Sequence, residues 1–246
     1  MKSCSETENS TEGVRINKYI SQCGYCSRRE ADRLLEQGKV FVNGSQALLG
    51  TKITPKDMVT IDGEILSNKP DEILIAFHKP AGVVCTTSKK DANNVIDYLH
   101  LKERVYPVGR LDKDSTGLLL LTNNGQLMDN ILRGSNFHEK EYIVTVDKEM
   151  PPSIYDAMEQ GVPILNTITR PCKITKPFRN TFHITLTQGL NRQIRRMCEY
   201  FGYRVKSLKR IRIMNIFLDD LEEGNWRYLT EEEIKKLKQL ASRKGM

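Results

Sequence analysis

The chain has 246 residues, of which 39% are hydrophobic, so it is long enough to bury a core in one large domain or two ordinary ones. Its longest apolar runs, at residues 73–77 and 118–121, are far too short for a membrane-spanning helix, and its polar first residues lack the apolar segment of a signal peptide. Together with six scattered cysteines, these features predict a soluble cytoplasmic protein with free thiols and no membrane contact.

The formal net charge of +7 is concentrated in one segment. Between residues 191 and 212 the chain has eight Lys or Arg residues and a single acidic residue, Glu199. A cationic patch of this density raises the local potential toward a polyanion, so we expect RNA or DNA as the partner. Five basic residues in the second half of the segment are expected to track phosphates: Arg204, Lys206, Lys209, Arg210 and Arg212.

The first residues, 1–13, have low hydrophobicity and predict a disordered tail. A short helix is expected next, because Ile16 and Ile20 lie on one helical face. Ser27 and Glu30 have the spacing of a capping box and predict the start of a second helix.

Short strands are expected after these helices, at residues 40–42, 47–49 and 58–61. An Asn-Gly pair at residues 43–44 predicts a hairpin turn between the first two. The pattern indicates a small ααβ module, followed by a turn-rich hinge at residues 67–71.

This module resembles the S4 RNA-binding domain. The resemblance rests on Cys-Ser-Arg-Arg-Glu-Ala at residues 26–31, Gly-Lys-Val at 38–40 and Val-Asn-Gly at 42–44. It extends over residues 14–72 and implies that basic side chains of the helical part bind RNA, namely Arg15, Lys18, Arg28, Arg29 and Lys39.

A second, larger domain is expected over residues 73–246. Its strands and helices alternate in a way that favours an α+β fold with a mixed, mainly antiparallel sheet. The last helix is expected to begin with a capping box of Thr230 and Glu233. Strands are predicted at 73–77, 105–108, 118–121, 142–146, 181–187 and 210–216, and helices at 126–133, 152–160, 191–201 and 231–242.

An acidic loop, Asp112-Lys113-Asp114-Ser115-Thr116, precedes the apolar run at 118–121. A calcium loop is disfavoured, because its twelfth position would be Asn123, which cannot supply the bidentate carboxylate. An aspartate-based phosphotransferase is disfavoured, because its nucleophile must directly follow a buried strand. The Cys23-Gly-Tyr-Cys26 pair lacks a second Cys-x-x-Cys, so no metal site is expected.

A third interpretation comes from a resemblance to RNA pseudouridine synthases. Gly-Arg-Leu-Asp at residues 109–112 and the stretch from Gly117 to Gly125 resemble the signature of that family. The resemblance implies that Asp112 attacks the target nucleotide. The glycosidic bond then breaks, the uracil turns over, and a carbon–carbon bond replaces the carbon–nitrogen one. It implies no cofactor and no metal.

A second motif of that family is matched by residues 189–197, where the arginine of Gln-Ile-Arg is Arg195. The resemblance implies that Arg195 pairs with the catalytic Asp112, whose ionised form needs a fixed cation against desolvation. In a helix over residues 191–201 the apolar side chains would form one stripe and the polar side chains, including Arg195, another. This pattern supports the assignment independently of the resemblance. Neighbouring residues in this motif are expected to contact RNA: Arg192, Gln193, Ile194 and Arg196.

The target uracil must be swung out of its stack before it can react. By resemblance, Arg110 enters the space that the base leaves, beside Leu111 and Lys113 as further RNA contacts. Lys140-Glu141-Tyr142 matches the Lys-x-Tyr motif of the family, which makes Tyr142 the ring that stacks on the uracil and a candidate for moving the C5 proton. Lys79-Pro80 matches a motif expected to be structural.

An S4 module ahead of this domain points to the RsuA type of synthase, which modifies ribosomal RNA. Residues 114–115, 138–142 and 212–215 look most like the RluF subfamily, which acts on a uridine of 23S rRNA. We therefore expect a monomer acting on 23S rRNA and possible action on tRNA. The alternatives are a synthase acting on 16S rRNA or a tRNA stem-loop, and a non-catalytic RNA-binding or ribosome-assembly factor.

Overall fold

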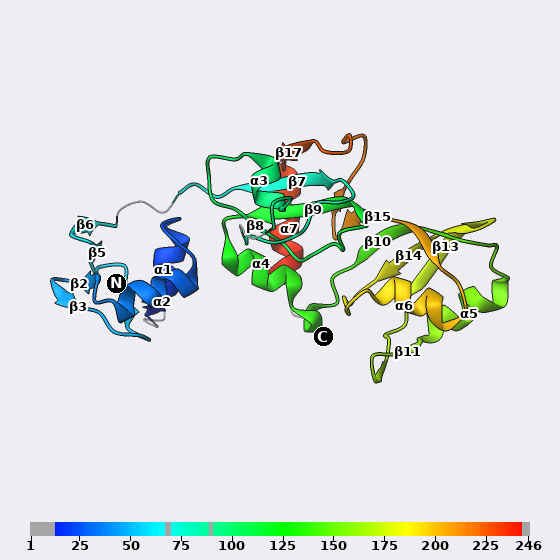
Figure 1. The fold of residues 1–246 in the computed structure, drawn as a ribbon, viewed down its shortest axis with the longest axis horizontal. Coiled ribbons are helices and arrows are strands. Elements are labelled where there is room, and N and C mark those ends of the chain that lie inside the picture. The colour runs from blue at the N-terminus through cyan, green and yellow to red at the C-terminus, as the bar shows by residue number, and fades with distance from the viewer. Residues whose placement is uncertain (1–12, 67–69, 89–90, 243–246) are drawn as a thin grey trace, which may run out of the picture. The chain divides into compact units, whose positions relative to one another are not determined.

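The computed structural model describes residues 13–66, 70–88 and 91–242, and the chain divides into two compact units between Asp71 and Glu72 (Figure 1). The tail predicted at residues 1–13 lies outside the described residues, apart from Gly13, and so does most of the predicted hinge. Within the described ranges, every helix is too short or too polar to cross a membrane.

The N-terminal unit has two helices and six short strands. Two pairs of residues, in β1 and β4, form a small ladder, and the other four strands form a sheet in the order β3-β2-β5-β6. The elements are β1 (Val14–Arg15), α1 (Ile16–Gln22), α2 (Arg28–Glu36), β2 (Val40–Val42), β3 (Ser45–Gln46), β4 (Lys52–Ile53), β5 (Val59–Ile61) and β6 (Glu64–Ile65).

Local sequence explains both helices of this unit. Ile16 and Ile20 are fully buried on one face of α1, as the spacing predicted. The Ser27 side chain accepts a hydrogen bond from the Glu30 amide at 3.1 Å and caps α2, whereas the Glu30 carboxylate turns to Arg33 instead of completing the box.

The strand predicted at residues 47–49 is wrong. The hairpin partner of β2 is β3, two residues earlier. Leu48 and Leu49 lie in a turn and are 69% and 54% exposed, because the Thr51 side chain accepts from the Leu48 amide there.

The larger unit is built on a nine-stranded sheet, which confirms the predicted α+β class. The main path runs β13-β14-β10-β15-β9-β7-β17, with β8 added to β9 and β16 to β15. Its strands are β7 (Leu74–Lys79), β8 (Tyr106–Pro107), β9 (Thr116–Thr122), β10 (Lys140–Val146), β13 (Lys173–Phe178), β14 (Thr181–Leu186), β15 (Val205–Ile213), β16 (Ile216–Phe217) and β17 (Trp226–Tyr228); β11 (Pro163–Ile164) and β12 (Thr167–Ile168) form a separate hairpin.

One pair of strands in this sheet is parallel. β15 lies between β10 and β9, antiparallel to the first and parallel to the second, where Arg210 faces Gly117. A Cβ on Gly117 would lie 2.2 Å from the Arg210 carbonyl oxygen, and Gly117 has a φ of 106°. Only glycine fits this approach, so the residue allows β15 to join the two halves of the sheet.

The helices cover the sheet in separate groups. On the β7–β9 half, α4 (Gly125–Leu132) and α7 (Glu231–Ser242) pack on one face, and α3 (Val95–Leu99) packs on the other. On the β10–β14 half, α5 (Pro152–Gln160) and α6 (Gln193–Tyr200) share a core with the sheet. Because both faces of β9 are covered, the continuous apolar run at 118–121 is fully buried.

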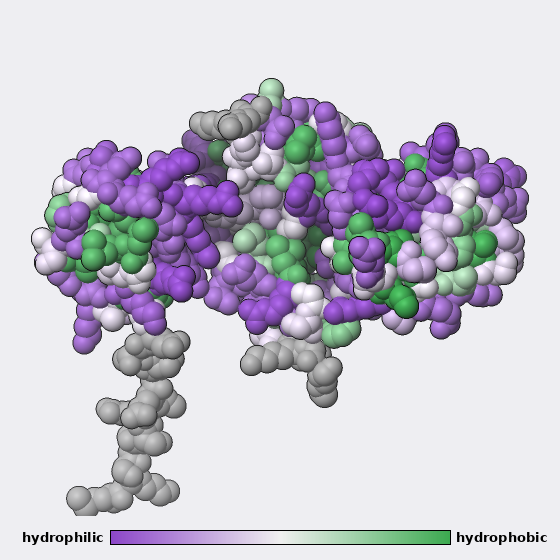
Figure 2. Space-filling view, turned by 60° about the horizontal axis from the view of Figure 1, so that its bottom comes forward, coloured by the Kyte–Doolittle hydropathy of each residue, from purple (hydrophilic) through white to green (hydrophobic). Residues whose placement is uncertain are grey.

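Most remaining predicted elements of this unit are confirmed with shifted ends. Thr230 and Glu233 form the reciprocal capping box of α7, at 3.2 and 2.8 Å. The strand expected at 210–216 is instead β15, which ends at Ile213 before a turn into β16. The surface is mostly hydrophilic on the face in Figure 2, in line with the mean hydropathy of −0.48.

Candidate active site

Asp112 lies in the loop that joins β8 to β9. The buried ammonium of Lys79, at the end of β7, anchors this loop by donating to the carbonyl oxygen of Lys113 at 3.3 Å, while the Gly82 amide donates to the same oxygen at 2.8 Å. Lys79 also donates to the carbonyl oxygens of Pro80 and Val83. Burial lowers the pKa of Lys79. The Lys79-Pro80 motif therefore fixes the loop that carries Asp112.

Two arginines flank the Asp112 carboxylate. Its Oδ2 atom lies 3.4 Å from Nη1 of Arg192 and 3.6 Å from Nε of Arg195. The Asp112 side chain is 28% exposed, so it is partly withdrawn from water beside these two cations. Both positive charges therefore face the same carboxylate oxygen of Asp112.

Arg195 is held by three parts of the fold. It belongs to α6, its Nη1 donates to the Val205 carbonyl oxygen at the start of β15, and its Nη2 donates to the Ser115 hydroxyl oxygen, both at 3.3 Å. Its side chain is only 14% exposed. Arg192 is more open, at 43%, and caps the first turn of α6 from a left-handed backbone conformation.

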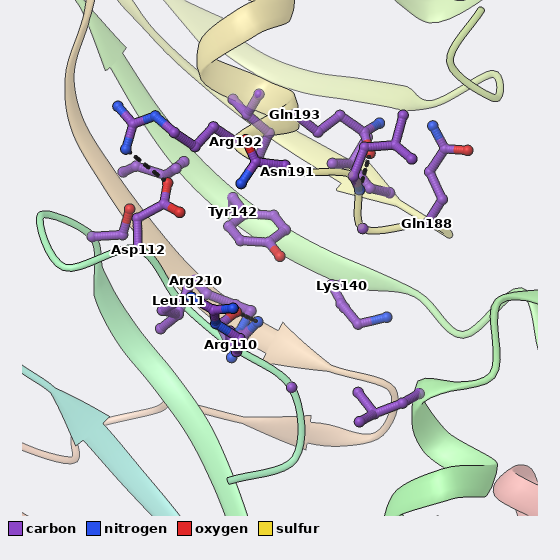
Figure 3. A pocket seen from close by; sticks show the side chains of 18 of the residues that line it. Arg110, Leu111, Asp112, Lys140, Tyr142, Gln188, Asn191, Arg192, Gln193 and Arg210 are labelled. Carbon is purple, nitrogen blue, oxygen red and sulfur yellow. Dashed lines mark hydrogen bonds and ion pairs between the residues drawn. The ribbon is translucent and has the colours of Figure 1, made fainter. Parts of the chain in front are cut away.

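A pocket of about 430 Å³ opens beside Asp112 (Figure 3). It brings together residues from the Asp112 loop, β10, β15 and the turn before α6. Seven of the predicted site residues line it: Arg110, Leu111, Asp112, Tyr142, Arg192, Gln193 and Ile194.

Tyr142, Lys140 and Arg210 form the strand side of the pocket. The guanidinium carbon of Arg210 lies 6.0 Å from the centre of the Tyr142 ring, and its Nε donates to the Leu118 carbonyl oxygen at 2.7 Å. Burial, helped by the nearby charge of Arg210, lowers the pKa of Lys140 to about 8. The pocket therefore has an aromatic wall between two cations.

Other predicted site residues lie outside this pocket. Arg195 reaches Asp112 from behind the lining, and Lys113 contributes its carbonyl oxygen to Lys79 while its side chain is exposed. Arg196 donates to the backbone and side-chain oxygens of Asn191. The five basic residues of the N-terminal unit that were predicted to bind RNA lie in a different unit from the pocket. Four of them are exposed, Lys18 is half-buried, and Lys39 pairs with Asp62 at 3.6 Å.

Sequence reasoning missed several residues of the site, among them Lys140, Gln188 and Ser115. Lys140 and Gln188 line the pocket, and Ser115 accepts from Arg195. Lys140 stood within the Lys-x-Tyr motif, two residues before Tyr142 on the same strand face, and that spacing could have identified it. Gln188 lies in an irregular segment without a periodic signal.

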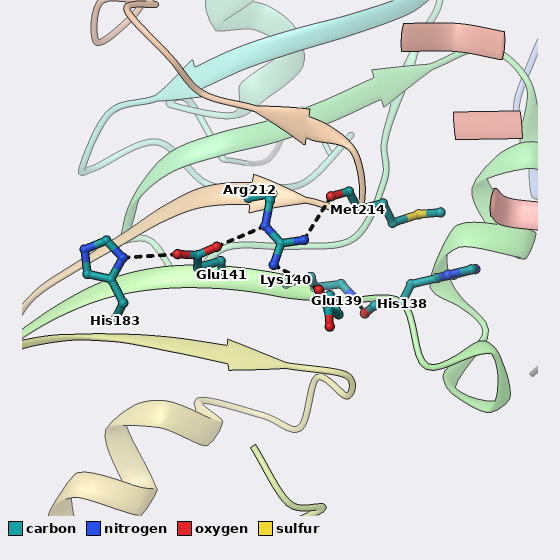
Figure 4. A network of polar contacts seen from close by, with 7 residues as sticks. All are labelled: His138, Glu139, Lys140, Glu141, His183, Arg212 and Met214. Carbon is teal, nitrogen blue, oxygen red and sulfur yellow. Dashed lines mark hydrogen bonds and ion pairs between the residues drawn. The ribbon is translucent and has the colours of Figure 1, made fainter. Parts of the chain in front are cut away.

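Two of the residues expected to track phosphates are engaged within the fold. Arg210 is only 2% exposed beneath Tyr142. Arg212 donates to Glu141 and to Glu139, each at 3.0 Å, and Glu141 also contacts His183 at 3.1 Å (Figure 4). We call Arg212, Glu139, Glu141 and His183 the Arg212 bracket. These residues join β10, β14 and β15 on the face of β10 opposite to that of Lys140 and Tyr142.

Metal ligands do not gather in the described part of the chain, where no three His, Cys, Asp or Glu side chains could hold an ion together. The five cysteines described are free thiols, as predicted. Burial raises the pKa of the Cys172 and Cys198 thiols to about 12.

Two family models match the chain. The model described as RNA pseudouridylate synthase matches residues 73–200, and the S4 domain model matches residues 14–66. The first match contains Asp112, Tyr142 and Arg195, and the second contains the basic residues predicted to bind RNA.

Characterised relatives resemble nearly the whole chain. The chain is 52% identical to the dual-specificity RNA pseudouridine synthase RluF of Escherichia coli K12, over 90% of this chain and 77% of that protein. It is 33% identical to the ribosomal large subunit pseudouridine synthase B of Bacillus subtilis, over 92% and 96%. A crystal structure of a pseudouridylate synthase matches with a TM-score of 0.67 and 30% identity, over 91% of this chain and 99% of that one.

Proposed function

The chain belongs to the RNA pseudouridylate synthase family, and we propose that it converts one uridine of 23S rRNA to pseudouridine with Asp112 as the nucleophile. Residues 14–72 act as the RNA-docking domain and residues 73–246 as the catalytic domain. The single observation that carries the assignment of the nucleophile is the Asp112 carboxylate, held by Arg192 and Arg195 at the edge of the pocket.

The environment of Asp112 suits a nucleophile. A carboxylate attacks only when ionised, and it attacks better when few waters solvate it. Two guanidiniums lie beside one oxygen, Oδ2, and leave the other oxygen outside both ion pairs. The neighbouring Asp114 is exposed, so it has no comparable setting.

The isomerisation conserves all atoms. Asp112 forms a bond to the nucleotide as the bond between C1′ and N1 breaks, and the uracil turns so that C5 bonds to C1′. N1 gains a proton, C5 loses one, and Asp112 is released. Tyr142 lines the pocket beside Asp112 and takes two roles in the proposal, stacking on the uracil and moving the C5 proton.

RNA docking is proposed to use both units. Arg110 and Arg192 are exposed at the pocket, and Arg15, Arg28 and Arg29 are exposed on the N-terminal unit. Cations at such positions attract phosphates and position the target without reading its sequence.

Two relatives support the choice of RNA. The name of the Bacillus subtilis relative specifies the large ribosomal subunit, and the RluF relative is named as having dual specificity. We therefore propose 23S rRNA as the main substrate and a tRNA stem-loop as an additional target. We also propose that the protein works as a monomer in the cytoplasm.

The test of the nucleophile is a pair of aspartate variants in the same loop. Asp112→Asn is expected to abolish pseudouridine formation in a single turnover on 23S rRNA while RNA binding is retained, because the amide keeps the shape and loses the nucleophile. Asp114→Asn is the matched control and should keep its rate within a few-fold. Pseudouridine formed by Asp112→Asn would remove this residue from the mechanism.

The test of the substrate is a comparison of RNA from cells with and without the protein. Pseudouridine is mapped in 23S rRNA, 16S rRNA and tRNA. A uridine of 23S rRNA that depends on the protein supports the proposal, whereas a dependent site in 16S rRNA or tRNA alone overturns that substrate. Binding of RNA without any dependent pseudouridine would instead identify a non-catalytic factor.

A further inference from the structure

An exposed aromatic residue, Phe137, stands in an unusual conformation next to the pocket. Its φ is 53° and its ψ is 33°, a left-handed conformation that side chains as bulky as phenylalanine rarely adopt. The residue is 49% exposed, so burial in a core does not explain why the chain holds it there. Strained residues of this kind concentrate where a side chain must be presented to a ligand.

Phe137 is stacked with an arginine from another part of the chain. The guanidinium carbon of Arg170 lies 4.1 Å from the centre of the Phe137 ring, and its Nη1 donates to the Gly134 carbonyl oxygen at 2.8 Å. Arg170 covers part of the Phe137 ring, and the rest of the ring surface is exposed. The pair therefore presents a flat aromatic and cationic surface to the outside.

Both partners are fixed before any ligand arrives. On the Phe137 side, Asn136 donates from its side chain to the Asn130 carbonyl oxygen at 2.9 Å and from its backbone to that of Arg133 at 3.0 Å. On the Arg170 side, the preceding Thr169 is buried and pairs with Val162 through both its backbone and its hydroxyl. A surface held in this way loses little conformational freedom on binding.

Phe137 belongs to a segment that begins and ends at the pocket that contains Asp112. Phe137 falls between Leu132 and Lys140 in the chain, and both of those residues line the pocket. Lys140 donates to the carbonyl oxygen of His138, which directly follows Phe137, at 3.2 Å. Arg133 is exposed and directly precedes Gly134, whose carbonyl oxygen Arg170 contacts, while the Glu139 carboxylate is paired with Arg212.

We propose that Phe137 and Arg170 form a stacking platform for an unpaired RNA base next to the uridine that enters the pocket. The inference rests on the proposed function, because it needs RNA at the pocket. Aromatic rings and guanidinium planes are the surfaces on which proteins stack splayed bases, and the cations of Arg133 and Arg170 suit the attached phosphates. Extruding one uridine also unstacks its neighbour, which exposes the face that such a platform receives.

The same structure provides a matched control. Phe178 is also exposed, at 71%, and the guanidinium carbon of Arg179 lies 5.3 Å from its ring centre. It belongs to the hairpin of β13 and β14, where Phe178 pairs with Thr181, at the opposite end of β14 from the pocket-lining Leu186. A general effect of removing an exposed phenylalanine would therefore appear at both positions. Loss of stacking beside the target uridine would appear only at Phe137.

The experiment uses the full chain and a hairpin RNA with one unpaired uridine, carrying the fluorescent base 2-aminopurine on one side of that uridine or the other. Stacking should quench the fluorescence for one of the two RNAs. Phe137→Leu should restore the fluorescence and weaken binding by about 5- to 150-fold, the range for loss of one base–aromatic stack. Phe137→Trp should keep the quenching, and Phe178→Leu should change neither reading.

The outcomes separate the platform from the proposed function. Quenching that is unchanged in Phe137→Leu, or an equal loss in Phe178→Leu, overturns the platform whether or not the RNA is modified. Pseudouridine formation is followed on the same RNAs and on 23S rRNA. Its absence with the wild-type protein overturns the proposed function, while loss of quenching specific to Phe137→Leu would still establish the platform as an RNA contact.

Discussion

Nε of Arg195 lies 3.6 Å from Oδ2 of Asp112, while the rest of the same guanidinium is committed to Ser115 and Val205. One side chain thus ties the Asp112 loop to α6 and to the start of β15. The Asp112 loop and the basic segment are connected through this residue.

Replacing Arg195 with lysine should lower the single-turnover rate about 10- to 100-fold, because an ammonium cannot contact Asp112, Ser115 and Val205 together. The control is Arg196→Lys, which changes the next residue, whose side chain donates to two oxygens of Asn191. The rate of pseudouridine formation at saturating enzyme is the measurement. Equal rates for the two variants would contradict the role of Arg195.

Replacing Gly117 with alanine should destabilise the larger unit by about 3 kcal/mol or more, because the new Cβ would lie 2.2 Å from the Arg210 carbonyl oxygen in a backbone conformation that disfavours it. Gly134→Ala is the control, since no atom lies within 4 Å of its ideal Cβ, and it should change stability by about 0.5 kcal/mol or less. Urea unfolding measures both. Similar stabilities would show that the two strands can separate locally without penalty.

The Arg212 bracket should act on the pocket without contacting RNA. Arg212→Gln should reduce the single-turnover rate and lower stability by about 1–3 kcal/mol, because Glu141 and Glu139 lose their shared cation. The slope of log K against log salt for RNA binding should stay unchanged. Arg192→Gln, which changes an exposed arginine, should reduce that slope by about 0.7 to 0.9 if it neutralises one phosphate. A reduced slope in Arg212→Gln would mean that Arg212 reaches the RNA.

Lys140 should make stability depend on alkaline pH. Its pKa in the folded protein is about 8 and its ordinary value is 10.5, so between these pH values the unfolded chain binds the extra proton. Raising the pH through this window therefore favours the folded state, by up to about 3 kcal/mol for this group. Between pH 7.5 and 9.5, the unfolding free energy of the wild type should therefore rise relative to that of Lys140→Met. A constant difference would place the Lys140 pKa near its ordinary value.

Much of the fold follows from local signals. The apolar run at 118–121 predicts the strand β9, and the Thr230–Glu233 box predicts the start of α7. The short helix α3 was missed, although Asn94 caps it by accepting from the Ile96 and Asp97 amides. Five residues are too few to show a helical period.

Elements whose position depends on distant partners could not be predicted. Arg210 stands among alternating basic and apolar residues, a pattern typical of an exposed strand face, and its burial requires the Leu118 carbonyl oxygen from a strand far away in sequence. The strand β13 is mostly exposed and has no clear alternation, so the sequence carried little signal for it. Motifs identified residues of the candidate site, but the distances between these residues became known only from the folded structure.

The position of β15 determines when the enzyme can first become competent during its synthesis. This strand leaves the ribosome after β7, β9, β10 and β14, yet it is inserted in the middle of the sheet, where it provides Arg210 beneath Tyr142 and receives Arg195 at Val205. A nascent chain that ends before β15 has the Asp112 loop and the S4 unit but lacks the strand that joins the two halves of the sheet. In such a chain the pocket lacks Leu208 and Arg210, so the proposed reaction has to wait until β15 has been made and inserted into the sheet.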